Sequence, residues 1–169
     1  MENSNHISLK NNRWQVIQPA IYLISILPGL VWCGLSFDRS ELGKISLLTL
    51  AVVLIQHGIN VLNDAIDWEK GADSEKELSW VHFHHLNIRL VRIHGITSFL
   101  LGTIIGITLI INSQKLEVLY VALPLVMLGY AYNAIQLPLS YTALGEWVTG
   151  ICYGAVFGCM GFVITGQIT

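Results

Sequence analysis

The sequence has 169 residues, of which 53% are hydrophobic and 12% are charged, a composition far from that of ordinary soluble domains. The formal net charge of −2 is close to neutral and gives no argument for a nucleic-acid partner. Cys33, Cys152 and Cys159 lie in apolar stretches without metal-ligand spacing or an even count, which excludes a disulfide framework. Lipid is therefore the expected solvent.

Uncharged stretches long enough to cross a bilayer, about 18–20 residues each, recur along the chain after a polar N-terminus at 1–13. Backbone polar groups cannot stay unpaired in hydrocarbon, and the stretches lack the alternating pattern of barrel strands. We therefore predict an all-α polytopic membrane helix bundle, a single transmembrane domain over 1–169. Its five predicted spans cover about 16–37, 45–66, 90–111, 118–135 and 144–164.

The connection at 67–89 holds most of the remaining charge and is long enough to carry short helices, so we expect a cap loop at the membrane surface. Lysine and arginine gather on the cytoplasmic side of membrane proteins. This bias predicts a cytoplasmic N-terminus and cap loop in an integral protein of a bacterial inner (cytoplasmic) membrane. The count is six to three: Lys10, Arg13, Lys70, Lys76, Arg89 and Arg92 against Arg39, Lys44 and Lys115.

Glycines recur at intervals of four in two predicted spans. Small residues at this spacing let helices approach closely in membranes, so we predict interhelical packing surfaces and assign them no ligand. They are Gly102 and Gly106 in the third span, and Gly150, Gly154 and Gly158 in the fifth, with Gly161 close behind.

A polar stripe descends the second half of the second predicted span. Side chains three and four positions apart share one face of a helix. Ionisable groups at membrane depth are costly unless they are paired, solvated or bound to metal, so such a stripe indicates function. It consists of Gln56, Asn60, Asn63, Asp64 and Asp67.

Gly71 follows the stripe and is expected to end the helix, because glycine readily adopts the left-handed conformation of helix C-termini. The chain beyond it would return Asp73 toward Asp64 and Asp67, beside the amide carbonyl of Asn60. An all-oxygen set of this kind suits a hard cation and predicts a Mg²⁺ site.

A plainer interpretation treats 64–77 as a hydrated loop whose charges mark the membrane boundary. We apply it to the charged residues of that loop outside the stripe. It does not explain polar residues reaching back to Gln56, so the functional interpretation is kept for the asparagines and aspartates. The hydrated charges are Glu69, Glu75, Lys76 and Glu77.

The stretch from Asn60 to Asp73 resembles the first aspartate-rich motif of the UbiA superfamily of intramembrane aromatic prenyltransferases. Its residue pattern is most similar to that of the 1,4-dihydroxy-2-naphthoate polyprenyltransferase branch of menaquinone biosynthesis. Residues 13–34 are similar to the first helix of the family, and 132–146 resemble the segment entering its fifth. The resemblance spans nearly the whole chain and implies the first half of the UbiA-type fold.

The resemblance implies that a prenyl group moves from polyprenyl diphosphate to an aromatic acceptor, with Mg²⁺ as the cofactor. Asp64 and Asp67 would be the catalytic carboxylates, with Arg89 and Arg92 as weaker basic candidates. By resemblance, the metal ligands are Asn60, Asp64, Asp67 and Asp73, and the diphosphate-binding residues are Asn60, Asn63, Lys70 and Arg13.

Two departures keep other hypotheses open. Family members are nearly twice this length and carry a second aspartate-rich motif, whereas this sequence has no carboxylate side chain after Glu146. In the second hypothesis, the chain is a non-catalytic half or scaffold subunit that a partner chain or homo-oligomer completes. A third hypothesis is a membrane metalloenzyme with imidazole ligands. Its candidate ligands are His82, His84 and His85, with His57 and His94.

Overall fold

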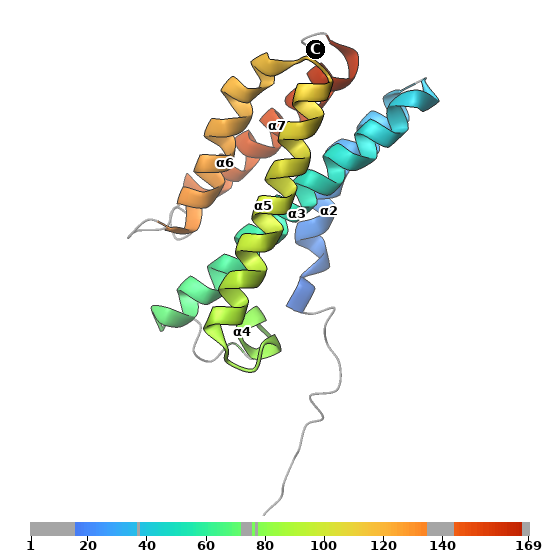
Figure 1. The fold of residues 1–169 in the computed structure, drawn as a ribbon. Helices are drawn as coiled ribbons and strands as arrows, with labels where there is room; N and C mark the ends of the chain where they lie inside the picture. Colours follow the sequence, from blue (N-terminus) through green and yellow to red (C-terminus); the bar gives the residue numbers. More distant parts are fainter. Residues whose placement is uncertain (1–15, 37, 72–75, 77, 135–143, 167–169) are drawn as a thin grey trace, which may run out of the picture.

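The computed structural model describes residues 16–36, 38–71, 76, 78–134 and 144–166, and regular structure within these ranges is entirely helical (Figure 1). This confirms the predicted all-α bundle. Short α4 (Trp80–Phe83) lies in the cap connection, and two 3-10 turns cover Arg39–Glu41 and Leu116–Val118. The longer helices are α2 (Pro19–Leu35), α3 (Leu42–Glu69), α5 (Ile88–Asn112), α6 (Leu119–Ala134) and α7 (Leu144–Thr165).

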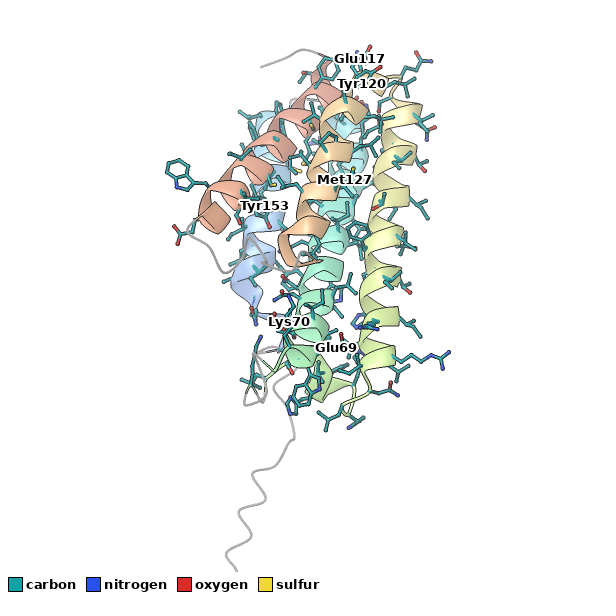
Figure 2. All side chains as sticks on the ribbon, turned by 90° about the vertical axis from the view of Figure 1, so that its left-hand side faces the viewer. Glu69, Lys70, Glu117, Tyr120, Met127 and Tyr153 are labelled. Atoms are coloured by element: carbon teal, nitrogen blue, oxygen red, sulfur yellow. The ribbon has the colours of Figure 1, made fainter. Side chains whose placement is uncertain are left out.

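The outer surface of the bundle is apolar. On α6, Tyr120 is 84% exposed and Met127 is 71% exposed (Figure 2). An apolar surface of this extent suits lipid better than water. Among the described residues, three helices are long and apolar enough to span a membrane, and the chain is therefore an integral membrane protein. These helices are Arg39–Glu69, Ile88–Asn112 and Gly145–Thr165, while Pro19–Leu35 and Leu116–Gly129 are apolar but shorter.

A helix thus occupies each of the five apolar segments recognised in the sequence. That all five cross the membrane stays a prediction, as do the single transmembrane domain over 1–169 and the cytoplasmic side of the cap.

The helices α3 and α5 are in backbone contact. A Cβ added at Gly58 of α3 would lie 2.7 Å from both the carbonyl oxygen of Gly95 and the amide nitrogen of Phe99. One added at Gly102 would lie 2.6 Å from the carbonyl oxygen of Ala51. Only residues without a side chain permit this approach, so these glycines set the distance between the two helices.

The other glycines singled out in the sequence are packed more loosely. Gly106 of α5 faces Ala51 at 3.9 Å, which is ordinary contact. In α7, by contrast, Gly150, Gly154 and Gly158 have no described atom within 4 Å of an added Cβ. In the third predicted span, close packing is therefore found at Gly102 but not at Gly106. In the fifth, among the described residues, it is found at Gly161, where an added Cβ would overlap the ring of Trp32, but not at the three glycines before it.

The bundle has a core cluster at each end. Glu69 and Lys70 mark one end and Tyr120 the other (Figure 2). At the Glu69 end, Trp80 and Val81 of α4 are buried together with residues of α3 and α5, so the cap is folded onto the bundle. The other cluster contains Trp32, Ile45, Leu48, Ile110, Val118, Met160 and Val163.

We expect Gly58→Ala to lower the free energy of unfolding by about 1–3 kcal/mol, because the new methyl group would overlap backbone atoms that cannot turn away. Denaturant unfolding in mixed micelles measures the change. Gly154→Ala is the matched control and should be neutral or slightly stabilising, since the site is open and alanine favours helix. Equal stability of the two variants would contradict the close packing of α3 on α5.

Candidate functional site

The polar stripe of α3 is held by hydrogen bonds one helical turn apart. The amide nitrogen Nε2 of Gln56 donates to Oδ1 of Asn60 at 3.3 Å. The amide nitrogen Nδ2 of Asn63 donates to Oδ2 of Asp67 at 2.8 Å. These pairs follow from the spacing of four residues, and they satisfy polar groups that would otherwise face apolar surroundings.

A cavity of about 430 Å³ opens beside this stripe, between α3, α5, α6 and α7. Gln56, Asn60 and Asn63 supply polar groups on the α3 side, and Tyr153 lies in the wall formed by α7. Most of the remaining lining is aliphatic, with Ile59, Ile107, Val126, Val156, Met160 and Val163 among it. The cavity therefore suits an elongated apolar ligand with one polar end.

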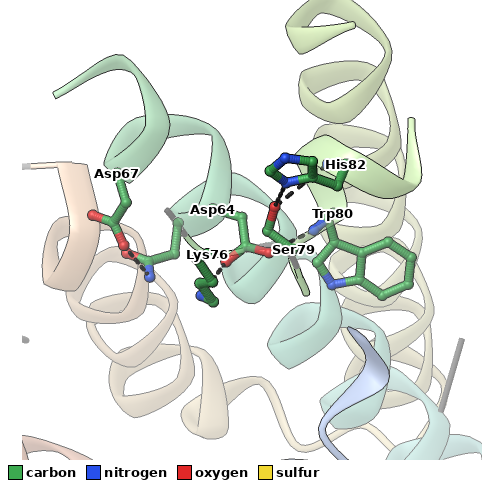
Figure 3. A network of polar contacts seen from close by, with 7 residues as sticks. Asp64, Asp67, Lys76, Ser79, Trp80 and His82 are labelled. Carbon is green, nitrogen blue, oxygen red and sulfur yellow. Dashed lines mark hydrogen bonds and ion pairs between the residues drawn. The ribbon is translucent and has the colours of Figure 1, made fainter. Parts of the chain in front are cut away.

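Asp64 turns toward the cap. Its side chain is buried, with 7% of the residue exposed. Oδ1 accepts a hydrogen bond from Nζ of Lys76 at 3.0 Å, and Oδ2 accepts one from the backbone amide of Trp80 at 2.8 Å (Figure 3). The ion pair and the backbone contact together compensate the burial of this carboxylate. They also tie the cap to α3.

Asp67 belongs to the other side of the stripe. It is 5% exposed and accepts a hydrogen bond from Asn63, which lines the cavity. Successive helical residues point about 100° apart, so neighbouring Asn63 and Asp64 face different surroundings. The stripe expected to share one face is thus divided between the cavity and the cap.

Lys76 is the residue that sequence reasoning missed. It was assigned to the hydrated loop charges, and that assignment is wrong, because its ammonium group pairs with the buried carboxylate of Asp64. Its side chain keeps 32% of its area exposed. A positive charge soon after an aspartate-rich helix end was the available signal, although sequence spacing alone does not fix such a pairing.

The remaining predicted site residues are placed as follows. Gly71 has φ of 73° and follows the last turn of α3, which confirms it as the helix end. Lys70 is exposed beside it. Asp73 and Arg13 lie outside the described residues, so the expected convergence on a metal remains a prediction.

The two basic residues of α5 are also exposed. Arg92 forms an ion pair with Glu69 at 2.6 Å, and Arg89 lies nearby in sequence on the same helix. An exposed pair of this kind contributes little to stability. The structure does not bring Arg89 or Arg92 to the cavity lining.

The histidines do not form a metal site among the described residues. His82 lies within hydrogen-bond distance of the Ser79 hydroxyl, at 3.1 Å, and His85 is exposed. His57, His84 and His94 meet in pairs, nitrogen to nitrogen, rather than around a common point. No group of three potential ligands from histidine, cysteine, aspartate and glutamate is present in the part of the chain that the structure describes.

The oxygen donors of α3 suit a hard cation better. Asn60, Asn63, Asp64 and Asp67 offer carboxylate and amide oxygens within two turns of helix. Asp64 already has a positive charge beside it in the form of the Lys76 ammonium group. Oxygen donors and buried negative charge are the features by which Mg²⁺ or Ca²⁺ is recognised, so the donor types on α3 suit a divalent metal. Asp64 and Asp67 face different surroundings, and their convergence on one ion remains a prediction.

A family model described as the UbiA prenyltransferase family matches residues 22–169. The chain belongs to the UbiA prenyltransferase family. This confirms the predicted resemblance to that family. Prenyltransferases of the UbiA family are generally dependent on a divalent metal, in agreement with the oxygen donors of α3.

Two curated relatives of this UbiA chain are named as transferases, one for a naphthoate and one for a naphthoquinone. This chain is 24% identical over 156 residues to a 1,4-dihydroxy-2-naphthoate octaprenyltransferase of Bacillus subtilis (strain 168). The match covers 89% of this chain and 50% of the relative. This chain is 26% identical over 145 residues to the chloroplastic 2-carboxy-1,4-naphthoquinone phytyltransferase of Arabidopsis thaliana, covering 84% of this chain and 37% of the relative. The chain thus spans half or less of the length of these relatives. No solved structure matches it.

We expect Asp64→Ala to loosen the cap, because it leaves the buried amide of Trp80 and the ammonium of Lys76 without this acceptor. The loss should be about 1–3 kcal/mol, with faster hydrogen exchange at the amides of 79–83. Glu69→Ala is the matched control and should cost less than about 1 kcal/mol, because its pair with Arg92 is exposed. Unchanged exchange in Asp64→Ala would show that Asp64 does not hold the cap.

Proposed function

We propose that this chain takes part in Mg²⁺-dependent transfer of a polyprenyl group from its diphosphate to an aromatic acceptor of quinone biosynthesis. The observation that carries the proposal is a pair of buried carboxylates, Asp64 and Asp67, on the helix whose amides line an apolar cavity. The carboxylates of such a helix can hold the metal and diphosphate, and the apolar cavity beside it can hold a hydrocarbon tail. Membership of the UbiA family and the naphthoate relatives support the same chemistry.

The cavity would hold the prenyl chain. Its aliphatic walls, from residues such as Ile59, Val126 and Val156, provide an environment that water enters unfavourably. Each methylene group buried there contributes about 0.8 kcal/mol, so a polyprenyl chain gains affinity along its length. Asn60 and Asn63 mark the polar end of the cavity, where the diphosphate would lie.

The diphosphate would be held at the end of α3. Asn60, Asp64, Asp67 and Asp73 are the proposed ligands of Mg²⁺, with Asn63, Lys70 and Arg13 for the phosphate oxygens. A bound Mg²⁺ ion neutralises negative charge that develops on a leaving diphosphate. Lys76 stands beside Asp64 and keeps a third of its side chain exposed, so it can turn toward a phosphate oxygen when a metal takes its place.

The protein would control the reacting carbon by excluding water. As the diphosphate leaves, positive charge develops on the allylic carbon of the prenyl chain, and water would capture it. The aliphatic lining of the cavity keeps the cation for the electron-rich ring of the aromatic acceptor. We place this chemistry at the cytoplasmic face of a bacterial inner membrane, where the lysine and arginine bias locates the cap.

A second candidate function is that of a membrane half or scaffold subunit that pairs with a partner. The observation favouring it is the open glycine face of α7, where Gly150, Gly154 and Gly158 have no described neighbour within 4 Å. Trp147 and Ile151 of the same helix are also well exposed. Small residues on an uncovered membrane helix favour a close helical contact.

Prenyl transfer in membranes that contain this chain distinguishes the two functions. We expect product from radiolabelled polyprenyl diphosphate and an aromatic acid in the presence of Mg²⁺. Asp64→Asn should abolish it, because the amide still accepts from Trp80 but carries no charge for a metal. Glu69→Gln, a change in an exposed carboxylate at the same helix end, should retain it.

Absence of product from correctly inserted wild-type chain would contradict transfer by this chain alone. It would favour the second function, which also predicts that Gly154→Leu abolishes assembly with a partner while neutral carboxylates leave assembly intact.

A further inference from the structure

Four polar side chains form a continuous hydrogen-bonded chain within the bundle. The hydroxyl of Tyr22 on α2 lies 2.5 Å from Nδ1 of His57 on α3. Nε2 of His57 lies 2.9 Å from Nε2 of His94 on α5. Nδ1 of His94 lies 3.1 Å from Nε2 of His84, which follows α4 in the cap. The contacts connect α2 with the cap through two apolar helices, and we call these four residues the imidazole chain.

The helix packing brings the imidazole chain together. His57 precedes Gly58 and His94 precedes Gly95, and these two glycines meet where α3 and α5 touch. The ring of Trp80 stands edge-on to both His57 and His94, with centroids 5.0 Å apart in each case. The two inner rings are therefore half-buried between α3 and α5, with the indole of Trp80 against both.

Both ring nitrogens of His57 and of His94 are used in these contacts. A neutral imidazole has one N–H donor and one acceptor nitrogen, so a chain of neutral rings can be satisfied in one direction throughout. Burial, followed by the neighbouring charge of His85, holds the pKa of His84 below its usual value. The outermost ring is thus neutral at pH 7, as such a chain requires.

We propose that the imidazole chain is a proton relay between the aqueous surface of the cap and the interior of the bundle. Histidine chains within membrane helices are a means by which protons reach sites that water does not. The inference rests on the contacts of Tyr22, His57, His94 and His84, and it does not depend on the proposed prenyl transfer.

The relay is balanced in bonds and charge. In outward transfer Tyr22 gives its hydroxyl proton to Nδ1 of His57, and the Nε2 proton of His57 passes to Nε2 of His94. The Nδ1 proton of His94 then passes to Nε2 of His84, and the Nδ1 proton of His84 passes to water. One N–H bond breaks and one forms at each ring, so every imidazole changes tautomer. The O–H bond of Tyr22 breaks and an O–H bond of hydronium forms. The phenolate left at Tyr22 then takes a proton from an acidic hydroxyl of a bound ligand, which keeps the negative charge.

The inner end of the relay lies near the cavity wall. Tyr22 is three residues before Ser25, one turn along α2. The Ser25 hydroxyl is 3.1 Å from the hydroxyl of Tyr153, which lines the cavity. A proton delivered to Tyr22 therefore arrives one helical turn from Ser25, whose hydroxyl contacts the cavity-lining Tyr153. An acidic hydroxyl of a ligand bound beside Tyr153 is the class of group that would exchange with it.

Hydrogen exchange at His57 tests the relay. The full chain, labelled with ¹⁵N at histidine, is placed in phosphatidylcholine–phosphatidylglycerol bilayers and moved into D₂O, and solid-state NMR follows the N–H signal of His57. In His94→Gln we expect this exchange to slow by more than about tenfold, because an amide donates and accepts hydrogen bonds but does not pass a proton at pH 7. Glu69→Gln alters an exposed carboxylate outside the chain and should leave the rate unchanged.

A purely structural role predicts the opposite result. Glutamine can replace both hydrogen bonds of His94, so exchange at His57 within twofold of the wild-type rate in His94→Gln, with the backbone amides of α3 equally protected, would overturn the relay. His84→Gln is the second variant. It changes the half-buried cap rather than a helix, and it should slow hydrogen exchange at His57 in the same way. Wild-type exchange at His57 in His84→Gln would equally overturn it.

Discussion

Backbone contact between α3 and α5 is the constraint on which the rest of the structure depends. The carbonyl and amide groups around Gly58 and Gly102, and the Leu62 side chain at Gly95, leave no room for a side chain. Because α3 is held against α5 on this face, its polar residues at Asn60 and Asn63 turn toward α6 and α7, where the cavity lies. The same contact brings the histidines that precede Gly58 and Gly95 within hydrogen-bond distance.

Burial of charge at the end of α3 explains the cap. A carboxylate such as Asp64 cannot be buried without compensation, and it obtains this from an ammonium group and a backbone amide of the following connection. The partners of Asp64 thereby fold the connection back over the helices and bury Trp80. Asp64 therefore has two effects: it supplies negative charge to the proposed metal and diphosphate site, and it holds the cap against the helices.

Hydropathy was enough to predict the helices, because apolar length is a local property: the second predicted span, 45–66, lies within α3. The stripe from Gln56 to Asp67 was also local, and its division between cavity and cap follows from a rotation of about 100° per residue. The pairing of Lys76 with Asp64 depends on tertiary folding, which spacing does not report. For the contact between α3 and α5 the sequence did contain a signal, because each helix has a His-Gly pair and these two pairs lie against each other in the structure.

Metal-dependent binding of polyprenyl diphosphate tests the central claim, that α3 holds a metal and diphosphate beside an apolar cavity. Asp67→Asn is the most informative variant, because the hydrogen bond from Asn63 lies within α3 and the cap contacts of Asp64 are left in place. Retention of the labelled ligand by the chain in lipid nanodiscs should require Mg²⁺, persist in Glu69→Gln, and be lost in Asp67→Asn. Binding that is independent of Mg²⁺, or equal in the two variants, would contradict the account.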